Sequence, residues 1–310
     1  MASGHHHKLF ILALDHRGSL KEQMFGIRGR APDRAELARL ADAKLLVWEG
    51  FRAALAGGVP PGNAGVLVDE ELGAAVAREA PSAGVVLVMP VEKSGEGPFD
   101  FEYGEDFGTH LEAFHPRFAK ALVRWNPDDD PAVKRLQAGR LRRLGEWLRA
   151  HGHRFLFELL VPPSPRQLAR AGGRSAEYDT RLRPGLMLES VREIQDARIE
   201  PDAWKIEGID TREGCELLAR LIRREGRDPV GALVLGRGAD RARVEHWVRT
   251  AAGVPGYAGF AIGRTIWWEG VEGWKDGILG RSEAVASIAA AYRHFVDVYE
   301  EAARPSPPAR

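Results

Sequence analysis

The chain has one cysteine, few lysines, no net charge and no long apolar run, and each of these features excludes a class of protein. The single Cys215 cannot form an intramolecular disulfide or a zinc ribbon, which fits the reducing cytoplasm. Lys plus Arg and Asp plus Glu both number 44, so no net field favours a nucleic acid or an anionic membrane. No apolar run approaches the ~20 residues of a membrane-spanning helix, and no signal-peptide core stands at the N-terminus. We expect a cytoplasmic protein with a small-molecule ligand, and this composition is compatible with a homo-oligomer.

The composition predicts one globular enzyme domain. Apolar residues make up 44% and charged residues 28% of the sequence, which is ordinary for such a protein. His5-His6-His7 precede the first predicted strand, so we interpret residues 1–7 as a flexible N-terminal arm or tag. No internal linker divides residues 8–302, which we expect to form a single domain. The proline-rich residues 303–310 are expected to be disordered.

Short apolar runs alternate with amphipathic helical patterns along the whole chain. Continuous apolar strands separated by helices predict a parallel sheet covered on both faces, and eight such units close most naturally into a (β/α)8 TIM barrel. A doubly wound open sheet is the alternative, but Asp15–Ser19 matches its glycine-rich loop poorly. The predicted strands are Lys8–Asp15, Gly65–Asp69, Gly84–Pro90, Phe118–Trp125, Arg154–Val161, Asp202–Glu207, Gly231–Leu235 and Gly256–Ile262. The predicted helices are Asp33–Ala56, one that begins at Asp130-Pro131, Leu186–Arg198, Arg212–Arg224, Arg241–Ala252 and Ser282–Ala303.

Lys205 lies among apolar residues of a predicted strand, in a chain that takes most of its positive charge from arginine. Arginine cannot replace it in imine chemistry, because a guanidinium does not readily lose a proton. The position therefore indicates a lysine that reacts with a carbonyl group. The alternative is a buried Lys–Glu pair that only stabilises the barrel.

Almost every predicted strand delivers an ionisable group to the carboxyl-terminal mouth, where TIM barrels carry out catalysis. A charge inside a barrel costs several kcal/mol unless it is paired, so we expect Lys120, Glu158 and Lys205 to be neighbours. Two crowded lysines should lower a lysine pKa from about 10.4 towards neutrality and so provide a free amine. The strand-end groups are Asp15 with Arg17, Asp69 with Glu70, Glu92 with Lys93, Lys120 with Arg124, Glu158, Lys205 with Glu207, Arg237 and Arg264.

Two glycine–arginine motifs follow the last two predicted strands and indicate a phosphate site. They are Gly236-Arg237-Gly238 and Gly263-Arg264-Thr265. Glycine allows backbone N–H groups to approach an anion, and arginine adds a bidentate clamp. The loops after strands seven and eight are the usual phosphate site of a barrel, so we expect a phosphorylated substrate.

We expect no metal in the site. His110, His115, His151 and His153 lack metal-ligand spacing, and surface or capping roles suit them better. A metal-dependent sugar-phosphate lyase or isomerase is the alternative, with Asp69, Glu70 and Glu92 as oxygen ligands.

The chain resembles the class I, Schiff-base aldolases related to tagatose-1,6-bisphosphate aldolase. It is most similar to the aldolase domain fused to bacterial 5-dehydro-2-deoxygluconokinase, an enzyme of myo-inositol catabolism. The resemblance runs in order from about residue 8 to 300. The matching blocks are Leu12–Gly18, Leu67–Glu70, Met89–Gly95, Phe157–Pro163, Glu200–Gly208, Leu235–Gly238 and Ala261–Thr265.

The resemblance implies a lyase without a cofactor, which forms its imine on Lys205. It implies Glu158 as the carboxylate that transfers protons, Asp15 and Lys120 as helpers of the hydroxyl and carbonyl chemistry, and Arg264 as a phosphate ligand. The implied substrate is 5-dehydro-2-deoxygluconate 6-phosphate, cleaved to dihydroxyacetone phosphate and malonate semialdehyde. Other expected ligands are Gly263, Gly236 and Arg237 for the phosphate, and Arg17, Lys93 or Arg124 for the far carboxylate.

Two alternatives remain open for the chain as a whole. One is a different sugar-phosphate lyase or isomerase on the same barrel, such as an aldolase of the tagatose-bisphosphate type. The other is a non-catalytic module that senses a sugar phosphate and associates with a sugar kinase.

Overall fold

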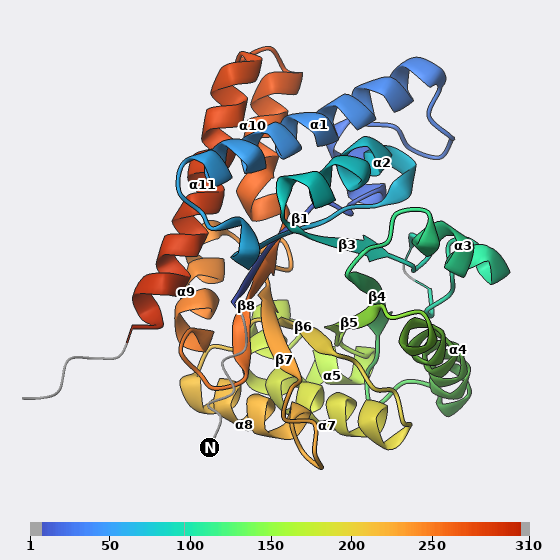
Figure 1. The fold of residues 1–310 in the computed structure, drawn as a ribbon. Coiled ribbons are helices and arrows are strands. Elements are labelled where there is room, and N and C mark those ends of the chain that lie inside the picture. The colour runs from blue at the N-terminus through green and yellow to red at the C-terminus, as the bar shows by residue number, and fades with distance from the viewer. Residues whose placement is uncertain (1–7, 96, 305–310) are drawn as a thin grey trace, which may run out of the picture.

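The computed structural model describes residues 8–95 and 97–304, which form a closed barrel of eight parallel strands surrounded by helices (Figure 1). Each strand pairs with the next one in the sequence, and the last strand pairs with the first. This arrangement confirms the predicted TIM barrel and excludes the open sheet. The strands are β1 Leu9–Ala13, β2 Ala64–Leu67, β3 Val86–Pro90, β4 Phe118–Arg124, β5 Arg154–Leu160, β6 Ala203–Glu207, β7 Gly231–Leu235 and β8 Tyr257–Ile262.

The helices lie on the outside of the barrel (Figure 1); α1 to α9 lie between successive strands, and α10 and α11 follow β8. They are α1 Arg34–Ala56, α2 Glu70–Glu79, α3 Phe107–Glu112, α4 Pro131–Ala150, α5 Pro165–Arg170, α6 Ser175–Glu177, α7 Arg183–Asp196, α8 Arg212–Ile222, α9 Arg241–Ala251, α10 Arg264–Lys275 and α11 Arg281–Ala302. Within this described part of the chain, none of the helices has the length and apolar character needed to cross a membrane.

The start of α4 follows directly from its sequence. Asp130 is the N-cap, and its side chain accepts a hydrogen bond from the N–H of Ala132. Pro131 occupies the first helical position, where a missing N–H costs nothing. This helix start agrees with the prediction.

Five of the described helices, α2, α3, α5, α6 and α10, are absent from the predicted pattern, and α2 and α10 are the longest of them. The backbone of α2 leaves helical geometry at Gly73, where φ is −121° and ψ is 15°, so its apolar spacing is interrupted. The N-cap of α10 is Gly263, which has no side chain to cap the helix. Helices α2 and α10 therefore depend on packing against the barrel, because the sequence of α2 lacks the regular apolar spacing, and that of α10 the side-chain cap, that would predict them.

Helices α1, α10 and α11 pack together against the side of the barrel that β1 and β8 form (Figure 1). Gly50 of α1 lies against Ile288 of α11, and a Cβ atom at Gly50 would lie 2.6 Å from the Ile288 side chain. The close crossing therefore depends on this glycine. The side chains between the helices and the outer face of the barrel form the larger apolar core of the protein.

A smaller apolar core fills the interior of the barrel. On three neighbouring strands, the inward residues Phe118, Leu156 and Ala203 belong to it or pack against it. Two residues further along each of these strands stand Lys120, Glu158 and Lys205. Because residues two apart share a face, these three side chains also point into the barrel. The barrel interior thus changes from apolar to ionisable towards its carboxyl-terminal mouth.

Two predicted segments lie at the ends of the chain. The predicted arm, residues 1–7, lies outside the described residues, as does most of the predicted tail, residues 305–310. The tail's first residue, Ala303, directly follows α11, and its N–H donates to the carbonyl oxygen of Tyr299.

Candidate active site

A cluster of ionisable side chains occupies the barrel interior at its carboxyl-terminal end. The cluster consists of Asp15, Glu92, Lys120, Glu158 and Lys205, all of which are buried or nearly so. Lys205 Nζ donates a hydrogen bond to Glu158 Oε1 at 2.6 Å. Lys120 Nζ lies 3.0 Å from Glu158 Oε2. The prediction that Lys120, Glu158 and Lys205 are neighbours is therefore confirmed.

Lys120 is surrounded by carboxylates. Its Nζ donates to Asp15 Oδ2 at 2.7 Å and to Glu92 Oε1 at 2.5 Å, in addition to its contact with Glu158. Burial alone would lower the pKa of Lys120, but the charges of these three carboxylates outweigh burial and raise it well above 10.5. The expectation that crowding with Lys205 lowers a lysine pKa is wrong at Lys120, because the carboxylates around it outnumber the cations. Lys120 is a permanent cation.

Asp15 and Glu158 remain ionised in this cluster. Burial raises the pKa of Asp15, but the nearby charges of Lys120, Lys205 and His16 outweigh it and bring the pKa far below its usual 3.8. Burial likewise raises the pKa of Glu158, and the two lysines outweigh it, so this pKa falls below 4.5. Glu158 therefore faces the amine of Lys205 as a carboxylate that can accept a proton.

Glu92 completes the cluster; the sequence predicted it as a strand-end group at the mouth but assigned it no role in the imine chemistry. It follows β3 in an isolated antiparallel bridge with Phe101. Burial raises its pKa, Lys120 opposes this effect, and the charge of Asp15 adds to it. Its buried Oε2 atom has no hydrogen-bond partner among the residues that the structure describes. The sequence indicated Glu92 through its position just after an apolar strand, and Asp15 has the same kind of position after β1.

His16 is a second residue that the sequence did not single out. Its ring packs edge-on against Trp267, with a centroid distance of 5.6 Å, and its Nδ1 lies 3.8 Å from Asp15 Oδ1. Burial lowers the pKa of His16, the charge of Asp15 opposes this, and the charges of Lys205 and Arg264 add to the lowering, so that the pKa falls to about 4. His16 is thus a neutral imidazole at neutral pH beside the carboxylate of Asp15.

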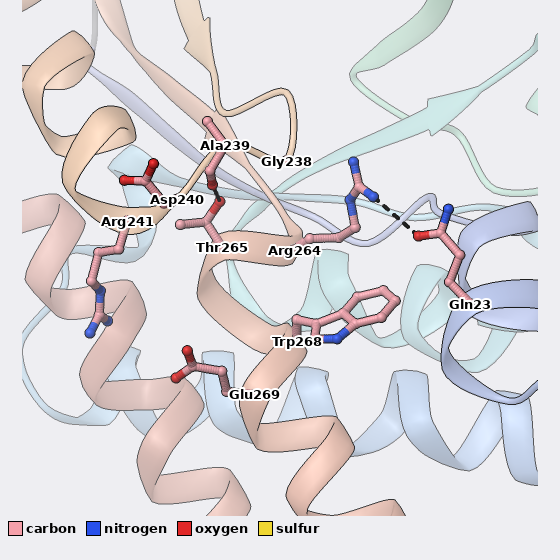
Figure 2. A pocket seen from close by; sticks show the side chains of 9 residues that line it. All are labelled: Gln23, Gly238, Ala239, Asp240, Arg241, Arg264, Thr265, Trp268 and Glu269. Atoms are coloured by element: carbon pink, nitrogen blue, oxygen red, sulfur yellow. Dashed lines mark hydrogen bonds between the residues drawn. The ribbon is translucent and has the colours of Figure 1, made fainter.

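A hollow at the amino-terminal end of α10 surrounds Arg264. Its guanidinium extends towards Gln23, with Nη1 3.4 Å from Gln23 Oε1, and the Trp268 ring lies nearby (Figure 2). Burial lowers the pKa of Arg264, and in the described chain no carboxylate pairs with it. Its Nε atom is buried and has no partner there. The hollow is lined by Gln23, Gly238, Ala239, Asp240, Arg241, Arg264, Thr265, Trp268 and Glu269.

Glycines after β7 and β8 bring the backbone close to this hollow. Gly238 has a left-handed φ of 73°, and a Cβ atom there would lie 2.3 Å from Arg264 Nη2. Gly236 faces Thr265, and Gly263 is the N-cap of α10. A helix amino terminus beside an unpaired guanidinium is a suitable site for an anion. The structure therefore brings Gly236, Gly263 and Arg264 together, as the two motifs predicted.

Arg237 is paired with carboxylates, although it stands between two glycines of the same loop. Its Nε is 2.9 Å from Glu207 Oε1, and its Nη1 donates to Asp179. These two carboxylates neutralise the guanidinium and raise its pKa against the effect of burial. Arg237 therefore braces the loop against the end of β6, and its guanidinium is already paired, unlike that of Arg264 in the described chain.

The other predicted ligands lie around the mouth, and they differ in whether other residues already pair with them. Arg17 is buried, and it donates to Glu102 Oε2 and to the carbonyl oxygen of Glu92, each at 2.7 Å. Arg124 donates to the carbonyl oxygen of Gly95 at 3.0 Å. The side chain of Lys93 is exposed. Lys93 and Arg124 therefore keep cationic groups that a substrate could approach, whereas Arg17 is already paired.

The three carboxylates of the metal alternative each have their own basic partner. Asp69 pairs with the buried Lys44, and Glu70 Oε2 lies 2.7 Å from His110 Nδ1. Glu92 is held by Lys120, as described above. Among the described residues, Asp69, Glu70 and Glu92 do not form a group with metal-ligand spacing.

Comparisons with known proteins identify a family and a fold. A family model described as "Uncharacterized protein conserved in bacteria (DUF2090)" matches residues 2–303. The structure is similar to fructose-bisphosphate aldolase from Plasmodium falciparum, with a TM-score of 0.66 and 14% identity over 94% of this chain and 89% of that one. It is also similar to Cgl0159 from Corynebacterium glutamicum, with a TM-score of 0.50 and 16% identity over 93% of this chain and 86% of that one. At these identities the likeness shows the fold. No curated protein matches the chain.

Proposed function

The chain belongs to the family described as uncharacterized protein conserved in bacteria (DUF2090), and from this premise we propose that it is a metal-independent class I aldolase. The substrate class is a phosphorylated keto-sugar acid, which is cleaved through an imine on Lys205. The observation that carries the proposal is the 2.6 Å contact between Lys205 Nζ and Glu158 Oε1, inside a buried cluster at the mouth of the barrel. A buried lysine beside a carboxylate has a local acceptor for the proton that it must lose before it attacks a ketone.

Imine formation needs one proton transfer in each direction, and Glu158 is placed for both. Lys205 passes a proton to Glu158, and its neutral amine then adds to the substrate ketone to give a carbinolamine. Glu158 returns the proton to the carbinolamine hydroxyl, which leaves as water. The product is an iminium ion on Lys205, and Glu158 is a carboxylate again.

Carbon–carbon cleavage uses the same pair of residues. Glu158 takes the proton of the hydroxyl group that is β to the imine carbon. The electrons of the O–H bond form the aldehyde, and those of the breaking C–C bond move into the iminium to give an enamine. Glu158 then protonates the enamine carbon, and water hydrolyses the imine. Asp15 accepts hydrogen bonds from the substrate hydroxyl groups and orients them, and the permanently charged Lys120 stabilises the developing oxyanion.

Arg264 and the start of α10 bind the phosphate in this proposal. The guanidinium has no carboxylate partner in the described part of the chain, so a phosphate group would supply the missing counter-charge. Gly236 and Gly263 leave room for backbone N–H groups to approach. Arg237 contributes by holding the loop after β7 in place, through its contacts with Glu207 and Asp179.

The proposed substrate is 5-dehydro-2-deoxygluconate 6-phosphate. Its ketone is adjacent to the phosphorylated carbon, so cleavage gives dihydroxyacetone phosphate and malonate semialdehyde. The resemblance to the aldolase domain of inositol catabolism supports this choice. The carboxylate at the far end of the substrate would meet Lys93 and Arg124, whose cationic groups are not paired with carboxylates in the described chain.

The test is a cleavage assay with a panel of phosphorylated ketoses and keto-sugar acids, in the presence of EDTA. Dihydroxyacetone phosphate is measured with a coupled dehydrogenase, and the aldehyde is measured separately. We expect turnover of the keto-sugar acid with a 1:1 ratio of the two products. Preferred turnover of a ketose bisphosphate would instead assign a tagatose-type aldolase. Binding of the phosphate ester without cleavage of any substrate would refute the aldolase proposal and favour a sugar-phosphate sensor.

A further inference from the structure

We propose that Glu112, His115 and His153 form a second ligand site, which binds a zinc ion at the end of the barrel opposite the active site. Their ligand atoms lie within 4.8 Å of one another. Glu112 is the last residue of α3, His115 precedes β4, and His153 directly precedes β5. Residues that precede barrel strands lie at the amino-terminal end, so this group is separate from the lysine–carboxylate cluster.

The orientation of His153 supports a metal ligand. Its Nδ1 lies 2.7 Å from the carbonyl oxygen of Pro116. A carbonyl oxygen only accepts hydrogen bonds, so Nδ1 carries a proton and the lone pair of the neutral ring is on Nε2. A backbone carbonyl that fixes the tautomer in this way is the usual outer partner of a metal-bound histidine.

The contact between His153 and Glu112 also favours a bound cation between the two side chains. Nε2 of His153 lies 2.9 Å from Glu112 Oε1. In the neutral tautomer both of these atoms are acceptors, and they would repel each other unless a proton or a metal ion lies between their lone pairs. Zinc bonds of about 2.0–2.2 Å place neighbouring ligand atoms roughly 3.3 Å apart in a tetrahedron. Only a small opening of the existing contact would therefore admit the ion.

His115 supplies the third ligand from the protein surface. Its backbone has a left-handed φ of 47°, which is uncommon for a residue other than glycine, and its Nδ1 lies 3.5 Å from Glu112 Oε2. The side chain is 75% exposed, so it can rotate onto an ion at little cost, and a water molecule could fill the fourth position. Two imidazoles and one carboxylate suit Zn²⁺ and exclude a preference for Mg²⁺ or Ca²⁺.

A rigid aromatic support holds the inner part of the group. The ring of His153 is nearly parallel to that of Trp147, at an interplanar angle of 9° and a centroid distance of 5.8 Å. Trp147 itself fills the space beside Gly108 of α3. A bound ion would therefore connect α3, the start of β4 and the start of β5, and would stabilise the native barrel. Glu112 and His115 are only three residues apart, but His153 comes from a distant segment, so the sequence alone does not show the three as one group.

Calorimetric titration of the EDTA-treated protein with ZnCl₂ tests this site. All proteins carry His5→Ala, His6→Ala and His7→Ala, so that the leader cannot contribute. We expect one ion to bind with micromolar or tighter affinity, and Mg²⁺ not to bind there. His115→Ala removes an exposed side chain, and Glu112→Gln keeps the shape of its residue. Each should weaken zinc binding by more than about tenfold, the lower end of the cost of losing even an outer partner.

The matched control is His246→Ala. His246 is also exposed, and its Nε2 lies 3.9 Å from Asp210 Oδ1, but it belongs to no three-ligand group in the described residues. Zinc should bind this variant as it binds the parent protein, and it should raise the apparent Tm of both but not that of His115→Ala. The site is refuted if the parent does not bind zinc, or if His115→Ala and Glu112→Gln bind it as tightly as the parent. Cleavage activity with EDTA is a separate measurement, so the two proposals can fail independently.

Discussion

Replacement of Lys120 by methionine tests the electrostatic account of the barrel interior. The substitution keeps most of the side-chain volume and removes the one cation that contacts Asp15, Glu92 and Glu158. Lys120 is 1% exposed, so water cannot replace the lost ammonium group without opening the barrel. Of the three carboxylates, Glu158 then keeps its contact with Lys205, whereas Asp15 and Glu92 lose the lysine that they contact.

The expected loss of stability is large. Removal of one partner from a buried ion pair costs about 3–5 kcal/mol, because an uncompensated charge is left behind. Here three carboxylates lose a partner, and protonation of one of them offsets part of the cost. We therefore expect the free energy of unfolding of Lys120→Met to fall by about 3–5 kcal/mol at pH 7.

The loss should depend on pH in a defined direction. The folded pKa values of Asp15 and Glu158 lie below their usual 3.8 and 4.5. A depressed acid pKa contributes stability above its unfolded value, and this contribution disappears as the pH falls through the folded value. Without Lys120, both pKa values rise and much of the contribution is lost. The difference in the free energy of unfolding between the wild type and Lys120→Met should thus be greatest near neutral pH and shrink below about pH 4.5.

Urea unfolding followed by circular dichroism between pH 4 and pH 7 measures both effects. Lys134→Met is the matched control, because Lys134 pairs with Glu193 at 3.0 Å near the surface. We expect this control to lose no more than about 1 kcal/mol. A loss below about 1 kcal/mol for Lys120→Met, or a loss that grows as the pH falls, would refute the reasoning.

Four other substitutions test individual roles. Lys205→Met should lower kcat by more than about 10⁴-fold, as loss of a covalent nucleophile does, and a variant with near wild-type turnover in the cleavage assay would contradict the assignment. Arg264→Met should raise KM for the phosphorylated substrate by about 10- to 150-fold, the equivalent of one charge-assisted hydrogen bond. An equal effect on an unphosphorylated analogue would show that Arg264 does not bind phosphate. Glu92→Gln should lower the free energy of unfolding at pH 7 by less than Glu158→Gln does, because burial favours neutral Glu92 while the lysines favour ionised Glu158. Urea unfolding measures both losses, and a larger loss for Glu92→Gln would contradict this distinction.

The barrel itself could be predicted because its signals are local and repeated. Each strand is an apolar run, and the cost of an unpaired charge inside a barrel predicts that Lys120, Glu158 and Lys205 are neighbours. Phe118 and Leu156, two residues before Lys120 and Glu158, belong to the apolar cluster inside the barrel, which agrees with that prediction. What the pattern could not give is the set of partners across the barrel, since Asp15 and Glu92 reach Lys120 from loops at the ends of other strands.

The direction of the pKa shift at Lys120 was missed for the same reason. The sequence showed two lysines and one glutamate on neighbouring strands, and from that set repulsion between cations looked decisive. Glu92 and Asp15 reverse the balance, and their approach depends on loop conformations that propensity does not encode. Arg237 is a similar case, because its partners Glu207 and Asp179 come from β6 and from the segment before α7.

Borohydride reduction in the presence of the phosphorylated keto-sugar acid, followed by peptide mass spectrometry, tests the central claim most directly. The account predicts one reduced adduct of dihydroxyacetone phosphate or the intact sugar acid, located on the peptide that contains Lys205. An unmodified Lys205 under conditions of active turnover, or an adduct located only on another lysine, would contradict it.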